Sequence, residues 1–268
     1  MFVFVPLVFS LGLTNLPELI ACVITFAAFC LASSSVYILN DLLDVDKDRL
    51  HPVKSMRPIA SGAIPTHYAA VFGSIILVGC VALASAVNLP TVLIIIGYLI
   101  VNIAYSLYLK HKPIFDCFCI AAGFVLRVYA GSTASGNKVS DWLFLSIISM
   151  SLFMAFGKRR GEMLKTNGSE TRKVLSQYNL GFLNGMVFVC AGLSIVFYSL
   201  WAMVREYGMI YTVPIVIFIV CKYLLFVHDD SHSDPTTVIF SSKTLIVACV
   251  AYAVLTVLLL YFIPEGLK

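Results

Sequence analysis

Charged residues are scarce in this sequence: they make up 12% of its 268 residues, while apolar residues make up 60%. A soluble domain carries about 25% charged residues and about 45 to 50% apolar ones. A water-soluble chain of this length could not bury so many apolar side chains, so we expect a polytopic membrane protein. The net charge of +4 is small and gives no indication of nucleic-acid binding.

Paired metal-binding or redox cysteines are also lacking. The eight cysteines are spread over apolar segments, with no CxxC pair and no histidine at metal-ligand spacing. We interpret them as small apolar side chains that fill space between helices. The run from His228 to Asp234 has metal-ligand residue types, but its composition before Pro235 favours a turn. No basic residue precedes the apolar stretch at residues 1–13, so a secretory signal is not indicated.

The apolar runs predict an all-α fold, a polytopic membrane bundle of about nine transmembrane helices in a single domain over residues 1–268. The expected spans are residues 2–13, 18–39, 67–87, 90–109, 114–134, 141–157, 184–204, 209–227 and 243–263. Most of them reach the roughly 17 to 25 residues that cross about 30 Å of hydrocarbon. The first is short, which leaves open whether that helix is truncated.

Basic residues alternate between the two sides of the expected bundle. They are concentrated in the loops after the second, fourth and sixth spans, whereas the opposite loops hold only Lys138 and Arg205. Because lysine and arginine are retained on the cytoplasmic side, this pattern predicts a cell-membrane protein with its N-terminus inside and its C-terminus outside. The charged loops, and with them any polar site, are expected at the cytoplasmic face.

An acidic motif follows the second span directly. Its members share oxygen-bearing side chains and would converge on one side of a continuing helix; they are Asn40, Asp41, Asp44 and Asp48. Carboxylates so placed repel one another unless a cation compensates them, and Mg²⁺ held by carboxylates and substrate phosphates is the usual solution. We therefore predict Asn40, Asp41, Asp44 and Asp48 as catalytic residues, with the three aspartates as metal ligands. Lys54 and Arg57, which follow closely, are predicted to bind substrate phosphates by donating hydrogen bonds. The alternative is a solvated acidic helix end.

Other polar residues lie within or next to apolar spans. Arg127 is deep in the fifth span, where a charge costs at least about 2.5 to 3.5 kcal/mol unless it faces protein or water, so we expect it to face the bundle. Asp116 is near the cytoplasmic end of the same span. Lys110 ends a polar stripe on the fourth span, with Tyr105 nearby. We predict all four as substrate-binding residues, with a structural role for Arg127 left open.

The motif Asn40-Asp41-x-x-Asp44-x-x-x-Asp48, the nine-helix plan and the charged cytoplasmic loops resemble the UbiA superfamily of membrane prenyltransferases over nearly the whole chain. The stretches at residues 57–62, 105–110, 123–127 and 157–162 resemble its decaprenyl-phosphate phosphoribosyltransferase branch. The resemblance implies Mg²⁺-dependent transfer of 5-phosphoribose from phosphoribosyl diphosphate to a polyprenyl phosphate, with release of diphosphate. Membrane lipids are further partners, and a homo-oligomer is left open.

The segment after the sixth span distinguishes the branches of this superfamily. The aromatic prenyltransferases resemble one another in a second aspartate-rich motif there, whereas this sequence has a basic cluster, Lys158, Arg159 and Arg160. We expect these residues to bind phosphate groups, although they could serve only as topology determinants. Members of the phosphoribosyltransferase branch also resemble one another in a basic stretch before the first helix, which this sequence does not contain.

Two other functions remain as alternatives at this point. The first is a prenyltransferase that attaches an isoprenoid to an aromatic or quinone-precursor acceptor. The second is a transporter or structural membrane protein, but transporters place charges near the midplane and often contain inverted repeats. Here the charges gather at one face, and no convincing internal repeat is present.

Overall fold

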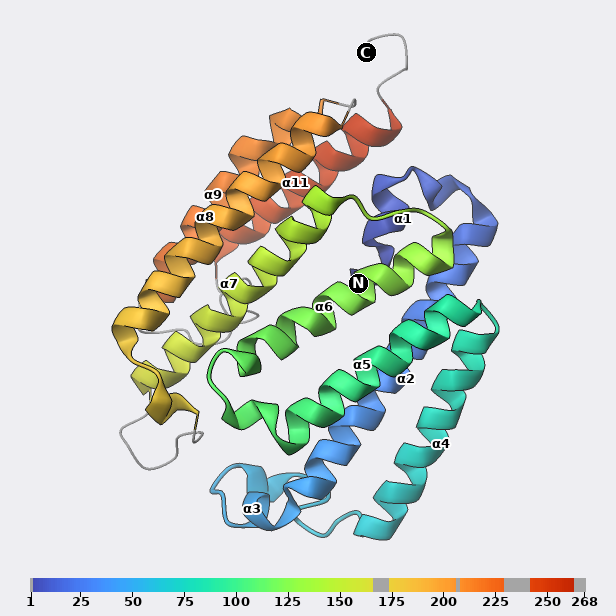
Figure 1. The fold of residues 1–268 in the computed structure, drawn as a ribbon, viewed down its shortest axis with the longest axis vertical. Helices are drawn as coiled ribbons and strands as arrows, with labels where there is room; N and C mark the ends of the chain where they lie inside the picture. Colours follow the sequence, from blue (N-terminus) through green and yellow to red (C-terminus); the bar gives the residue numbers. More distant parts are fainter. Residues whose placement is uncertain (1, 166–173, 206–207, 229–241, 263–268) are drawn as a thin grey trace. The chain divides into compact units, whose positions relative to one another are not determined.

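The computed structural model describes residues 2–165, 174–205, 208–228 and 242–262 (Figure 1). Within these ranges the chain is helical and has no strand. The expected all-α membrane fold is confirmed, because eight helical segments in the described ranges are long and apolar enough to cross a membrane. They correspond to the helices α2 (Leu16–Leu43), α4 (Thr66–Ser85), α5 (Leu89–Leu107), α6 (Phe115–Ser135), α7 (Asp141–Lys165), α8 (Leu180–Val204), α9 (Val213–His228) and α11 (Lys243–Tyr261).

The first expected span is corrected by the structure. Residues 2–13 form a 3₁₀ turn at Phe2–Phe4 and the short helix α1 (Val5–Phe9), and Leu11 then adopts a left-handed conformation with φ of 64°. A left-handed residue ends a right-handed helix, so this segment does not become a transmembrane helix. It packs instead on α6, where the missing side chain of Gly131 lets the Val3 carbonyl approach.

The described helices belong to two compact units. The first comprises residues 1–107 and 126–138, and in it α2 packs against α4 and α5 (Figure 1). Its core combines small side chains with the edge-to-face pair Phe29 and Tyr98, whose ring centroids are 5.2 Å apart. Small residues such as Ala28 and Ala32 allow close helix approach, which is the main source of packing energy within a membrane.

The second unit comprises residues 108–125 and 139–268, and its most extensive contact joins α7 and α8. Phe153 and Tyr223 form an edge-to-face pair in its core, with centroids 5.1 Å apart. α9 packs on α8 and α11 in the same unit. The single domain expected over residues 1–268 stays a prediction.

The cysteines form no disulfide: all eight are free, and Cys22, Cys80, Cys117 and Cys190 are buried. The burial of these four agrees with their interpretation as apolar side chains that fill space between helices, whereas Cys30 and Cys221 are exposed. Most of the run from His228 to Asp234 lies outside the described residues.

Candidate functional site

The acidic motif occupies the end of α2 and the short helix α3 (Val45–Arg49). A single continuing helix was expected here, but α2 ends at Leu43, and Asp44 has φ of −101° and ψ of 8°. Aspartate is a poor helix former, which explains a local break at this residue. The i to i−4 hydrogen bonds of the backbone nevertheless continue through this residue. The Asp44 amide donates to the Asn40 carbonyl at 3.0 Å, and the Asp48 amide donates to the Asp44 carbonyl at 2.8 Å. The motif therefore keeps a nearly helical course.

Two of its carboxylates are joined by one guanidinium. Arg57 Nη1 lies 2.8 Å from Asp41 Oδ1 and 2.7 Å from Asp48 Oδ2. Lys54 Nζ is 3.9 Å from the second Asp48 oxygen. The Asp48 side chain is only 5% exposed, so its charge is compensated largely by these cations rather than by water. Arg57 and Lys54 thus supply positive charge beside these carboxylates, and the predicted Mg²⁺ stays a prediction.

The loop after α3 positions the Arg57 side chain. A 3₁₀ turn covers Lys54–Met56, and Arg57 is extended at φ −62° and ψ 143°, the conformation that a following proline favours. The Ser61 amide donates to the Arg57 carbonyl at 2.8 Å, and Arg49 Nε donates to the Ala60 carbonyl at 3.3 Å. These bonds hold the loop against α3, so Arg57 reaches back to the carboxylates from a fixed backbone.

The other acidic side chains of the segment differ in environment. Asp44 is partly buried and lies 3.3 Å from Lys47 Nζ, while Asn40 is partly buried. Asp46 is 90% exposed and pairs at 3.4 Å with Arg49. Asp46 thus lies apart from the candidate site.

The donor chemistry of this site is suited to Mg²⁺. Magnesium in proteins is commonly held by one or two carboxylates together with substrate phosphates and water, and Asp41 and Asp48 present two oxygens that converge on one point. No group of three His, Cys, Asp or Glu side chains within the described ranges is arranged to hold a metal ion. The predicted third ligand, Asp44, therefore stays a prediction.

The second unit contains a buried polar cluster that includes two predicted site residues. Asp116, at the start of α6, accepts a hydrogen bond from Arg159 Nε at 2.6 Å and one from the Tyr178 hydroxyl at 2.6 Å. Arg159 Nη1 also contacts Glu162 at 2.5 Å. Asp116 and Arg159 are 0% and 1% exposed, so these two predicted substrate-binding residues bind each other inside the protein.

Tyr178 is the cluster member that the sequence did not indicate. Its hydroxyl accepts a hydrogen bond from the Ile114 amide at 2.6 Å, and Ile114 itself has a positive φ of 71°. Burial, and then the hydrogen bond to Asp116, raise the pKa of Tyr178 above its ordinary value. A lone tyrosine 62 residues from its partner gives no periodic signal, so only the folded chain could identify it.

The rest of the basic cluster is divided between the interior and the surface. Arg160 is 6% exposed, donates to Asn184 Oδ1 at 2.7 Å and also donates to the Val227 carbonyl. It therefore ties α7 to α8 and α9. Lys158 is partly exposed. Arg159 and Arg160, which were predicted to bind phosphate, thus hold other parts of the protein instead.

Arg127 faces protein, as expected. Its Nη2 donates to Ser33 Oγ at 3.1 Å and to the Tyr98 hydroxyl at 2.9 Å. The guanidinium also lies 4.7 Å from the centroid of the Tyr98 ring. These contacts explain how α6 can carry a charge in an apolar span. A role in substrate binding stays a prediction for this residue.

The predicted polar stripe on α5 is interrupted. Asn102 donates to the Tyr98 carbonyl at 2.8 Å, and Tyr105 is partly buried on the same helix. The helix ends at Leu107, so Lys110 lies in a 3₁₀ turn and not at the end of a stripe on the helix. This corrects the predicted stripe, because the spacing argument requires an unbroken helix.

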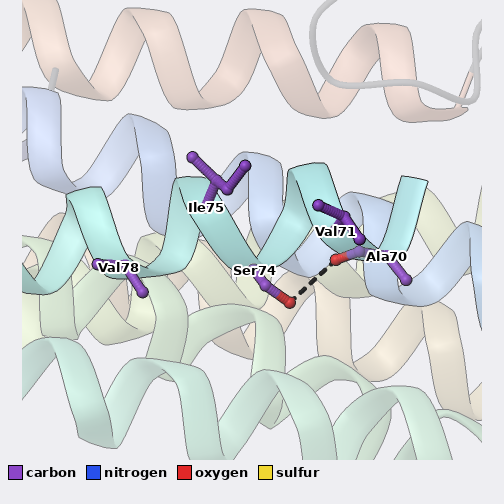
Figure 2. Close-up of a pocket in the computed structure, with 5 residues that line it drawn as sticks. All are labelled: Ala70, Val71, Ser74, Ile75 and Val78. Carbon is purple, nitrogen blue, oxygen red and sulfur yellow. Dashed lines mark hydrogen bonds between the residues drawn. The ribbon is translucent and has the colours of Figure 1, made fainter. Parts of the chain in front are cut away.

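A groove on the first unit lies elsewhere, along α4. It is lined by Ala70, Val71, Ser74, Ile75 and Val78 (Figure 2). The only side-chain polar group among them, the Ser74 hydroxyl, donates to the Ala70 carbonyl at 2.9 Å within the helix. The groove thus offers no charged group to a phosphorylated substrate, and the acidic motif remains the candidate site.

Comparisons with known proteins identify the family. The model of the UbiA prenyltransferase family matches residues 1–245. A decaprenyl-phosphate phosphoribosyltransferase of Corynebacterium glutamicum is 31% identical over 261 residues, covering 93% of this chain and 79% of that protein. The enzyme of the same name from Mycolicibacterium smegmatis is 35% identical over 185 residues; the match covers 68% of this chain and 58% of the relative's length.

Solved structures show the same fold. A UbiA homolog from Archaeoglobus fulgidus bound to DMAPP and Mg²⁺ has a TM-score of 0.74 at 19% identity, over 96% of this chain and 94% of that chain. The apo UbiA homolog from Aeropyrum pernix K1 has a TM-score of 0.65 at 15% identity, over 95% and 94%. The family match shows, in agreement with the eight candidate spans and the acidic motif, that this multi-pass membrane chain belongs to the UbiA prenyltransferase family.

Proposed function

We propose that this protein transfers 5-phosphoribose from phosphoribosyl diphosphate to a decaprenyl-type polyprenyl phosphate and releases diphosphate, in a Mg²⁺-dependent reaction at the cytoplasmic face of the cell membrane. The observation that carries the proposal is the likeness to a decaprenyl-phosphate phosphoribosyltransferase over 93% of the chain. The paired acidic and basic side chains around Asp48 support it, since they offer partners to both a metal ion and phosphate groups.

In the proposed reaction an oxygen of the lipid phosphate forms a bond to C1 of the ribose, and the bond from C1 to the diphosphate oxygen breaks. The electron pair leaves with the diphosphate. The lipid phosphate is already an anion near neutral pH, so no protein nucleophile is required. The work of the protein is to position the two substrates and to stabilise charge as it develops on the leaving group.

The residues around α3 have separate roles in this scheme. Asp41 and Asp48, with Asp44 as a third ligand, would hold Mg²⁺, which supplies positive charge to the departing diphosphate. Lys54 and Arg57 would donate hydrogen bonds to phosphate oxygens; their side chains are 45% and 39% exposed, which leaves them accessible to a substrate.

The basic cluster of α7 needs a different role from the one that its sequence suggested. Arg159 and Arg160 are buried in contacts with other helices, so we propose that they hold the cytoplasmic ends of α6 to α9 in place. Lys158, which is partly exposed, remains the member of the cluster proposed to bind a phosphate.

The experiment supplies labelled phosphoribosyl diphosphate and a polyprenyl phosphate to membranes that contain the protein. We expect a labelled lipid and released diphosphate, both lost on addition of a magnesium chelator. Asp48→Asn should lose at least about 100-fold in rate, as expected for removal of one charged group from a transition-state site. Asp46→Asn makes the same charge change at a residue outside the site and serves as the matched control.

The alternative substrates give the opposite outcome. If product forms only from a prenyl diphosphate and an aromatic acid, the protein is an aromatic prenyltransferase and the proposal is wrong. Equal rates for Asp48→Asn and Asp46→Asn would remove the acidic motif from the mechanism.

A further inference from the structure

The contact between Arg57 and the acidic motif has an unusual geometry. A single nitrogen, Nη1, lies within 2.8 Å of oxygens from two different carboxylates, those of Asp41 and Asp48. Because both oxygens contact the same nitrogen, the distance between them is at most the sum of the two contact distances. A bidentate pair would instead place two nitrogens on the two oxygens of one carboxylate.

This position is where a divalent cation would bind. Magnesium requires oxygen ligands from separate groups to converge on one centre, and Asp41 and Asp48 converge on Nη1. Removal of the guanidinium would leave two like charges close together, one of them on a side chain that is 5% exposed. The guanidinium thus keeps the two carboxylates close together, and it also occupies the position between them where the ion would bind.

We propose that Arg57 is an internal substitute for the metal ion, which the metal displaces only when a diphosphate is present to receive the guanidinium. This inference rests on the proposed site of the transferase reaction, though not on the identity of its substrates. In the free protein the guanidinium competes with the cation. A bound diphosphate removes this competition, because its oxygens accept the same hydrogen bonds that the carboxylates accepted.

The surroundings of Arg57 allow this exchange. Its backbone is held in the loop by the bond from the Ser61 amide, and Arg49 fastens the same loop to α3. The side chain, by contrast, is 39% exposed and makes its two contacts at its tip. A change of side-chain rotamer therefore releases the carboxylates without unfolding the loop, and exposed side chains change rotamer quickly.

The test measures binding of Mn²⁺ alone to the purified full chain, by the loss of the free-ion signal in electron paramagnetic resonance. Arg57→Gln should bind Mn²⁺ at least roughly tenfold more tightly than the unmodified protein, since the ion no longer has to displace two hydrogen bonds and one charge-assisted hydrogen bond is equivalent to about one factor of ten. Inorganic diphosphate should increase Mn²⁺ affinity more in the unmodified protein than in Arg57→Gln, because only the former has a competing guanidinium to release.

Lys138→Gln is the control, because it removes a positive charge from an exposed side chain that lies outside the acidic motif and the loop of Arg57. It should leave Mn²⁺ affinity unchanged. Asp48→Asn should reduce Mn²⁺ binding both on its own and when combined with Arg57→Gln, which locates the ion at the motif. If Arg57→Gln is unstable without metal, its stabilisation by Mn²⁺ alone is measured instead, and the proposal requires a larger shift in melting temperature than the unmodified protein shows.

The proposal is overturned if Arg57→Gln binds Mn²⁺ no more tightly than the unmodified protein, or if Lys138→Gln tightens binding equally. Neither measurement uses phosphoribosyl diphosphate or a lipid acceptor. Failure of this inference is therefore distinct from failure of the proposed transferase activity, which the labelled-donor assay decides.

Discussion

Replacement of Asp116 by alanine tests the buried cluster of the second unit most directly. In the folded protein Asp116 accepts hydrogen bonds from Arg159 and Tyr178, both at 2.6 Å. Asp116→Ala removes both acceptors at once and leaves a guanidinium that is 1% exposed, whose charge Glu162 compensates only in part. We expect the second unit to lose stability while the acidic motif stays intact.

The size of the effect follows from burial. Breaking a buried ion pair by removal of one partner costs about 3 to 5 kcal/mol, and a buried hydroxyl left without its acceptor costs about 1 to 3 kcal/mol. These costs are not additive for neighbouring groups, and the contact from Arg159 to Glu162 survives the substitution. A loss of about 3 to 5 kcal/mol in the free energy of unfolding is therefore expected.

The assay is unfolding in mixed detergent micelles, followed by tryptophan fluorescence. Both tryptophans, Trp142 and Trp201, lie in the second unit, so the signal reports on the part of the protein that is perturbed. Asp46→Ala is the control: its side chain is 90% exposed, and a surface ion pair contributes only about 0 to 1 kcal/mol.

A double variant distinguishes a charge effect from a packing effect. Asp116→Ala with Arg159→Met removes the uncompensated charge as well as its partner, so it should recover part of the stability lost in the single variant. A loss below about 1 kcal/mol for Asp116→Ala, or no recovery in the double variant, would refute this account of the cluster.

Three further predictions concern packing, pH and topology. Gly131→Ala should cost about 1 to 3 kcal/mol in thermal unfolding followed by circular dichroism, which reports on the helices of both units, because its methyl group would overlap the Val3 backbone. Gly185→Ala has open space and should be neutral or stabilising in the same measurement. The raised pKa of Tyr178 means that its contribution to stability is complete below its unfolded pKa of roughly 10 and is lost as pH rises through the folded value; Tyr178→Phe should flatten the alkaline fall in an unfolding-versus-pH series. In intact cells an impermeant maleimide should label Lys138→Cys but not Met56→Cys, since the loop that contains Lys138 is predicted outside and the loop that contains Met56 inside. Labelling of Met56→Cys alone would show that the proposed orientation is inverted.

Composition and local pattern were sufficient for much of the fold. The scarcity of charge indicated a membrane environment, and eight of the expected apolar runs became helices long enough to cross a membrane, since helices satisfy their backbone hydrogen bonds in lipid. The helices α2 and α7 extend several residues beyond the runs expected for them. The residues at 2–13 were the exception. Their apolar composition favoured a span, but the left-handed conformation of Leu11 depends on packing that composition does not report.

The candidate site was predicted in its chemistry more than in its contacts. The acidic motif and its need for a cation could be read from spacing, because the repeat of a helix fixes which side chains lie together. That Arg57 itself lies between Asp41 and Asp48 depends on the path of a loop. The break at Asp44 and the end of α5 at Leu107 likewise changed local geometry that the spacing argument assumed to be regular.

The sequence by itself determined the membrane environment, the positions of most helices and the acidic motif, because each depends on residues that are neighbours along the chain. Only the tertiary structure decided which charges bind one another. Asp116 and Arg159 are 43 residues apart, and the sequence alone led us to predict each of them as a substrate-binding residue. In the folded chain each lies buried against the other, since a charge removed from water is stable only beside a partner that folding brings to it.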